Sequence, residues 1–153
     1  MALFLMVAGQ TIVASGVSAA PTKPHFSSEP LSISSQTGAS HAFTVEVAVN
    51  DAEREYGLMF RTDMAADHGM LFRFDKVQRV QMWMQNTVLP LDMLFLDASG
   101  KVTHIVEQAV PYSQTIIDSG GPVRYVVELN GGIVQKLNLA VGDKVSSATI
   151  GKP

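Results

Sequence analysis

The chain has 153 residues, which predicts one domain, and its formal net charge of −3 offers no basic excess to nucleic acid. Hydrophobic residues make up 46% and charged residues 16%, a balance that favours a packed globule over a disordered chain. Cysteine is absent, which excludes disulfides, thiolate nucleophiles, thiolate metal sites and lipid-modified cysteines.

Residues 1–20 predict a signal peptide. The segment MALFLMVAGQTIVASGVSAA is mostly apolar or small and carries no charge, and Val17 and Ala19 stand at the −3 and −1 positions of a cleavage site. Its apolar core is too short and too interrupted for a stable membrane span. The basic start of a typical signal is missing, so a loose apolar arm is the alternative. We expect a periplasmic or secreted protein.

Residues 21–30 are rich in proline and serine and predict a linker, so the folded domain is expected over residues 31–150. A short edge strand is expected at residues 31–34. Asn50 predicts the start of a two-turn helix that ends near Gly57, with Glu53 completing a capping box. Period-two alternation or dense apolar runs predict further strands over residues 41–49, 69–74, 79–86, 90–97, 101–108 and 123–130, and after residue 143.

The strands dominate, and none alternates with a long helix. The fold class is therefore mainly β, a small β-sandwich or barrel-like domain with two short helices, the second over about residues 132–137. The run at 90–97 is apolar on both faces and predicts a central strand. Turns are predicted at residues 75–78 and 119–122, and the loop at 109–122 is long enough to present functional groups.

Six sequence motifs resemble the DUF192 family of uncharacterised bacterial and archaeal proteins. They are GLMFR (57–61), GMLF (69–72), WMQNT (83–87), PLDMLFLD (90–97), SGGPVRYVVELNGG (119–132) and VGDKV (141–145). The resemblance covers about residues 31–150 and implies a compact, mostly β fold, often behind a signal peptide, with no established reaction. The family's motif positions correspond to Gly57, Arg61, Gly69, Trp83, Asn86, Thr87, Pro90, Asp92, Glu128, Gly131 and Gly142, without known roles.

The first candidate site is the segment around Trp83. By alternation this residue shares its strand face with Gln81 and Gln85, which suits an aromatic platform that meets a ligand. The alternative is a tryptophan that covers the edge of the core. Asn86 and Thr87 end the strand, where they either line the site or only form a turn.

Two carboxyl groups lie in strands that are expected to be buried. Asp92 needs donors, for which Arg61, Asn86 and Thr87 are the candidates, and it is either a pocket group or a structural tie. Glu128 shares a strand face with Asn130, and Asp92 with Glu128 forms a candidate acid–base pair.

No histidine-based metal motif is present in the sequence, and no cofactor is expected. Met64 and His68, with Met59 and Met70 nearby in the sequence, provide thioether and imidazole ligands that suit Cu(I). The alternative is that these methionines fill gaps in the core.

We expect a monomeric, exported domain that binds a small polar ligand or a protein partner near Trp83 and Asp92, without nucleic acid and without a stable membrane span. The residues assigned to this site are Arg61, Trp83, Asn86, Thr87, Asp92, Glu128 and Asn130. A hydrolase or lyase that uses Asp92 and Glu128 is one alternative, and a copper-handling protein that uses Met64 and His68 is another. An enzyme should show one carboxyl of raised pKa in a concave pocket, whereas a binding module should show an open aromatic surface and ordinary carboxylates.

Overall fold

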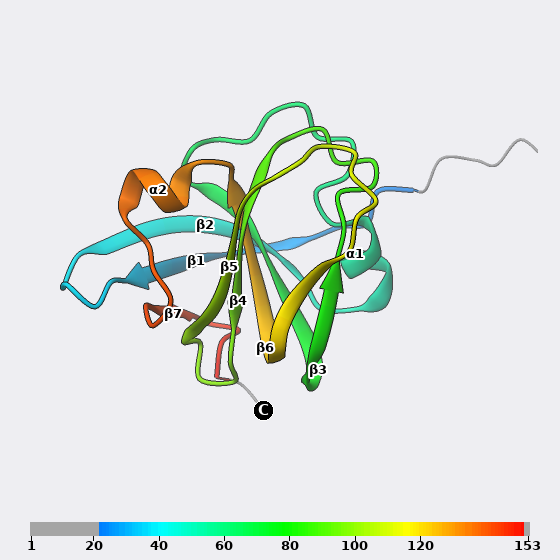
Figure 1. Ribbon diagram of the computed structural model, residues 1–153. Coiled ribbons are helices and arrows are strands. Elements are labelled where there is room, and N and C mark those ends of the chain that lie inside the picture. Colours follow the sequence, from blue (N-terminus) through cyan, green and yellow to red (C-terminus); the bar gives the residue numbers. More distant parts are fainter. Residues whose placement is uncertain (1–21, 152–153) are drawn as a thin grey trace, which may run out of the picture.

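Within residues 22–151, which the computed structural model describes, seven strands form one sheet and two short helices lie in its connections (Figure 1). The strands are β1 (Ser27–Ser34), β2 (Ser40–Ala48), β3 (His68–Met82), β4 (Leu91–Leu96), β5 (Val102–Ala109), β6 (Ile117–Asn130) and β7 (Lys144–Ser147). The helices are α1 (Asp51–Tyr56) and α2 (Ile133–Leu137). The predicted class, mainly β with two short helices, is confirmed.

The sheet curls into a half-barrel. Its strand order is β5-β4-β6-β3-β2-β1-β7, with β2 and β3 parallel and the other neighbours antiparallel. Lys101, just before β5, bridges to Lys144 of β7, and the N–H of Val145 donates to the carbonyl of Gly100 at 2.8 Å. The two edge strands therefore meet at one end only.

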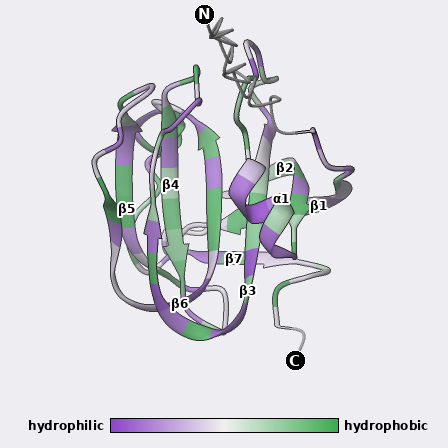
Figure 2. Ribbon diagram, turned by 90° about the vertical axis from the view of Figure 1, so that its right-hand side faces the viewer, coloured by the Kyte–Doolittle hydropathy of each residue, from purple (hydrophilic) through white to green (hydrophobic). Residues whose placement is uncertain are grey.

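Each face of the sheet carries its own apolar cluster. Figure 2 shows hydrophobic and hydrophilic residues alternating along the strands. On β4, Leu94 and Leu96 pack in one cluster with Ile133 of α2, while Met93 and Phe95 belong to the cluster on the opposite face. All six residues of β4 are buried. The central strand predicted at 90–97 is therefore confirmed, and the alternation decides which face a polar side chain enters.

Strands β3 and β6 are longer than the sequence indicated. Residues 74–77 of β3 oppose Arg124 alone on β6, which is a wide bulge, and the glycines of residues 119–122 lie at a second register shift. The turns predicted at 75–78 and 119–122 were therefore wrong. Both segments lie inside strands. The sequence predicts turns there because the polar and glycine residues that allow a bulge are the same ones that favour a turn.

Strand β1 also differs from the prediction. It begins at Ser27, inside the predicted linker 21–30, and it pairs with both β2 and β7, so it is not an edge strand. Its serine-rich exposed face hid the alternation of Leu31 and Ile33, which are buried. The predicted signal peptide at residues 1–20 lies outside the described residues. Among the helices of residues 22–151, none has the length and apolar character needed to cross a membrane.

The short helix α1 is held by its ends. The backbone N–H of Glu53 donates to Asn50 Oδ1 at 3.0 Å, and the carboxylate of Glu53 accepts from the N–H of Asn50, so the predicted capping box is confirmed. The helix ends at Gly57, which has a φ of 48° and lies against the ring of Phe72 on β3. The chain that leaves α1 therefore packs directly against β3.

Gly69 of β3 lies where the neighbouring strand β6 leaves no room for a side chain. A Cβ at Gly69 would overlap the backbone oxygen of Glu128, whereas Gly121 has open space around it and a negative φ. We expect Gly69→Ala to lower the free energy of unfolding by about 1–3 kcal/mol, since overpacking a tight site forces the backbone to shift. Gly121→Ala is the matched control and should change it by less than about 0.5 kcal/mol. Urea unfolding measures both, and equal stability of the two variants would contradict the close approach.

Candidate functional site

The two candidate carboxyl groups lie on neighbouring strands but on opposite faces of the sheet. Asp92 of β4 pairs with Leu129 of β6, and Glu128 pairs with Met93. Directly paired residues share a face, and consecutive residues alternate, so the two side chains point away from each other. The predicted acid–base pair of Asp92 and Glu128 is therefore not formed.

Asp92 is a structural tie. Its side chain is fully buried, and its two carboxyl oxygens accept the backbone N–H groups of Gln108 and Val134, each at 2.8 Å. Gln108 lies at an irregular position of β5 with a φ of 48°, and Val134 lies in the first turn of α2, whose N-cap Gly132 supplies no side-chain bond. The expected donors were wrong: Asp92 binds these two backbone groups, neither Arg61 nor the Asn86–Thr87 turn.

Glu128 is a buried carboxyl group without a partner. Its residue is 4% exposed, and no hydrogen bond or ion pair joins the carboxyl to another group among the described residues. Burial away from water raises the pKa of Glu128 from 4.5 to about 8. At neutral pH the group is therefore largely a neutral acid that can both donate and accept a hydrogen bond.

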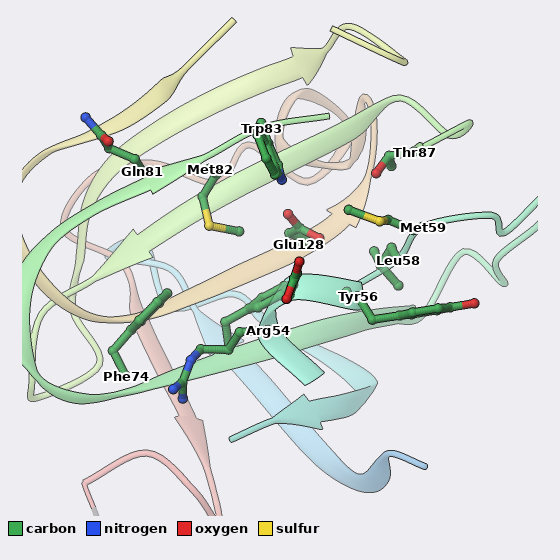
Figure 3. Close-up of a pocket in the computed structure, with 13 residues that line it drawn as sticks. Arg54, Tyr56, Leu58, Met59, Phe74, Gln81, Met82, Trp83, Thr87 and Glu128 are labelled. Atoms are coloured by element: carbon green, nitrogen blue, oxygen red, sulfur yellow. The ribbon is translucent and has the colours of Figure 1, made fainter. Parts of the chain in front are cut away.

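Glu128 lies at the floor of an open cleft of about 280 Å³ (Figure 3). The walls come from α1 and the turn that follows it, from β3, and from the segment after β3. Besides Glu128 the lining residues are Arg54, Glu55, Tyr56, Gly57, Leu58, Met59, Phe72, Phe74, Gln81, Met82, Trp83 and Thr87. Tyrosine, phenylalanine, tryptophan, leucine and methionine predominate, so the cleft is a mainly apolar hollow with one buried acid, Glu128, at its floor.

Trp83 lies at the rim of this cleft with 45% of its surface exposed. Figure 3 shows its indole nitrogen and the carboxyl of Glu128 pointing into the same space. A second hollow of about 420 Å³ adjoins the first, shares Tyr56, Met59 and Trp83 with it, and extends to Asn86. The open aromatic surface predicted at Trp83 is present, and the carboxyl group beside it is Glu128 instead of Asp92.

The segment after β3 is fixed by its backbone. Asn86 has a φ of 54°, and its carbonyl accepts the N–H of Phe60 at 2.9 Å. The carbonyl of Thr87 accepts the N–H of Tyr112 at 3.1 Å, and its own N–H donates to Met84. Asn86 and Thr87 therefore form the predicted turn, and they also line the hollows.

Two of the predicted site residues lie outside the cleft. Arg61 pairs with Glu46 in a separate hollow. Asn130 donates its side-chain N–H groups to the carbonyls of Met64 at 3.1 Å and Ala65 at 2.9 Å, which ties that loop to the end of β6. With Asp92, three of the predicted residues therefore lie outside the cleft. Trp83, Thr87 and Glu128 line it, and Asn86 lines the hollow beside it.

The copper candidates are separated in the fold. Met64 and His68 line the hollow that also contains Arg61, whereas Met59 lines the main cleft and Met70 is fully buried in the core. Neither of those two thioethers joins Met64 and His68 in their hollow. Arg61 and Glu46 line the same hollow, and their ion pair occupies the carboxylate that could otherwise have served as a metal ligand.

The fold and its cleft define a small half-barrel β-domain with a single acid at the floor of an apolar hollow. The sequence model of DUF192, described as "Uncharacterized ACR, COG1430", matches residues 32–147, and the chain belongs to this family. No curated protein matches it.

Two solved structures are similar to this chain. One is a protein of Sinorhizobium meliloti 1021 that is named a "putative transcription regulator"; it is 47% identical over 83% of this chain and 98% of its own, with a TM-score of 0.81. The other is a protein of unknown function from Novosphingobium aromaticivorans DSM 12444; it is 35% identical over 90% of this chain and 99% of its own, with a TM-score of 0.74.

Asp92→Ala leaves two buried backbone donors without an acceptor. Each such donor costs about 1–3 kcal/mol, so we expect the free energy of unfolding to fall by at least about 2 kcal/mol. Denaturant unfolding measures the loss. A loss below about 0.5 kcal/mol would show that Asp92 does not hold β5 and α2 together.

Glu128 makes the stability of the domain depend on pH. Between the unfolded pKa of 4.5 and the folded pKa of about 8, the folded state binds more protons than the unfolded state. This group therefore lowers stability as pH rises, by about 1.4 kcal/mol per pH unit in that window.

Glu128→Gln removes this contribution and keeps the shape of the side chain. The variant should gain stability relative to the wild type on going from about pH 5 to about pH 7.5, and the comparison cancels the histidines that titrate in the same range. Thermal or urea unfolding at both pH values measures the difference. A stability difference that is independent of pH would mean that Glu128 is not desolvated.

Proposed function

We propose that this domain binds a small ligand in the cleft floored by Glu128 and rimmed by Trp83, with the apolar body of the ligand against the walls and one polar group on Glu128. The observation that carries the proposal is the buried carboxyl without a partner in an open apolar cleft. The carboxyl oxygens make no hydrogen bond within the described part of the chain and are accessible from the cleft, so a partner that enters from outside can reach them.

The tryptophan supports the same proposal. Trp83 exposes 45% of its surface beside the cleft, although burying a large aromatic ring would stabilise the fold. Exposed aromatic side chains next to a concave surface are typical of binding sites, where they supply contact area at a low cost in conformational entropy.

A lyase or another proton-transfer enzyme is the second candidate, and the raised pKa of Glu128 favours it. A carboxyl that ionises near neutral pH is suited to general acid–base work. No histidine, cysteine, serine or lysine is among the described residues that line the cleft, and besides Glu128 the polar groups there that could act on a substrate are Glu55, Tyr56 and Thr87. The enzyme alternative rests on Glu128, the buried one of the two acids.

We also propose export to the periplasm or the cell exterior, which rests on the uncharged apolar segment 1–20. The expected monomer and the expected absence of nucleic-acid binding stay predictions, the latter supported by the net charge of −3. Copper binding at Met64 and His68 has less support than the cleft, because the ion pair of Arg61 and Glu46 lines the same hollow.

Trp83 is the only tryptophan of the chain, so its fluorescence reports on one place. We expect small amphiphilic molecules to shift this emission when they enter the cleft. Trp83→Phe removes the reporter, so the affinity of this variant is measured by calorimetry. We expect the variant to bind the same molecule at least about fivefold more weakly, because contact area and the indole N–H are lost.

The matched control is Tyr112→Phe, which changes an exposed aromatic residue outside the cleft and should leave the affinity unchanged. Equal affinities for wild type and Trp83→Phe would contradict the proposed site. Consumption of a molecule that binds, abolished in Glu128→Gln, would decide for the enzyme over the binding module.

A further inference from the structure

We infer that the ligand of this cleft is a small organic cation, an ammonium group on an apolar body, whose nitrogen pairs with Glu128 and whose body packs between Met59, Met82 and Trp83. This inference rests on the proposed binding function and adds the chemical class of the ligand. It follows from the residues that line the cleft and from the lack of a cationic partner for Glu128 among the described residues.

The floor of the cleft lacks a positive charge. Arg54 is the one cationic residue among the described residues of the lining, and its guanidinium is engaged elsewhere. It donates to the carbonyls of Val49 at 2.6 Å and Arg73 at 2.8 Å, and it pairs with Asp51. These bonds hold the guanidinium away from Glu128, so residues 22–151 provide no counter-ion for that carboxyl.

The walls of the cleft are electron-rich. Figure 3 shows Met82 on one side of Glu128 and Met59 on the other, with Trp83 between them. The face of an indole ring attracts cations, and thioether sulfur is soft and polarisable. An ammonium group above Glu128 would therefore meet a carboxyl below it and favourable surfaces around it.

The mouth of the cleft carries an acidic residue, as the floor does. Glu55 is exposed and lines both the main cleft and the hollow that adjoins it. An anionic ligand would pass one carboxylate and end beside a second acid, so the electrostatics select against it. A neutral ligand would leave Glu128 a neutral acid, and a cation would convert it into a paired carboxylate.

The volume limits the size of the ligand. At about 280 Å³ the cleft is at the small end of ligand sites, so it fits a small amine better than a peptide or a sugar chain. The adjoining hollow beyond Trp83 gives room for a longer apolar tail.

The test compares three probes with the same apolar body: n-hexylammonium, n-hexanol and hexanoate. Calorimetry on the full chain at about pH 7 should rank the ammonium first and hexanoate last, with at least about a tenfold difference between the ammonium and the alcohol. Glu128→Gln should abolish this preference and leave the affinity for n-hexanol within about twofold. Glu107→Gln, which removes an exposed carboxyl of β5 outside the cleft, should keep the preference.

A second measurement needs no variant. Glu128 is largely protonated before binding and ionised after it pairs with the ammonium, so binding should release nearly one proton to the buffer. Calorimetry of n-hexylammonium in buffers of different ionisation enthalpy counts that proton. n-Hexanol should release none.

The outcomes separate this inference from the proposed function. If n-hexanol binds as tightly as n-hexylammonium, with no proton released, the cation is wrong and the binding site stands. If hexanoate binds best, the cleft prefers an anion and the inferred cation is wrong. If none of the three probes binds, the cation is wrong and the proposed binding function loses its support as well.

Discussion

The antiparallel pairing of β4 with β6 is the constraint on which the rest of the structure depends. All of β4 and residues 125–129 of β6 are buried, so the polar side chains of these paired segments must enter one face of the sheet or the other. The register sets Asp92 opposite Leu129 and Glu128 opposite Met93, which sends one carboxyl to each face. A shift of one residue would exchange these roles and bury the wrong set of side chains.

The two acids then differ because of what covers them. Asp92 meets the ends of two elements whose backbone N–H groups need an acceptor, and it becomes part of the framework. Glu128 faces a mostly apolar cleft and has no hydrogen-bond partner within the described part of the chain. The same functional group, a carboxyl buried to a similar extent, therefore serves structure on one face and is available for chemistry on the other.

Much of the fold could be predicted from the sequence, because local patterns encode it. The capping box at Asn50, the central strand at 90–97 and the second short helix all depend on neighbours in the chain. The bulges were missed because residues such as Gly120 and Gly121 favour turns in isolation and are held in a strand only by the partner strand. The extent of β1 was missed because its exposed face is serine-rich.

The site could be predicted only in part. Trp83 and Glu128 were selected from alternation and residue type, but their meeting depends on how segments far apart in sequence cover the sheet. Arg61 and Asp92 were assigned to the same groove because the sequence shows neither where the loop that carries Arg61 packs nor which face of the sheet Asp92 enters. The wall residues Met59 and Met82 resemble ordinary core residues, and no local pattern distinguishes a methionine that lines a cleft from one that fills a core.

The loop between α1 and β3, whose residues 57–59 line the cleft, is fixed by hydrogen bonds that do not involve any ligand. The N–H of Phe60 is held by the carbonyl of Asn86, and the side chain of Asn130 holds the backbone at Met64 and Ala65. The loop between α1 and β3 is therefore anchored along its length to the turn after β3 and to the end of β6. A cleft of this kind is preorganised: a molecule that enters it loses its own freedom of motion, but it does not have to order the protein first.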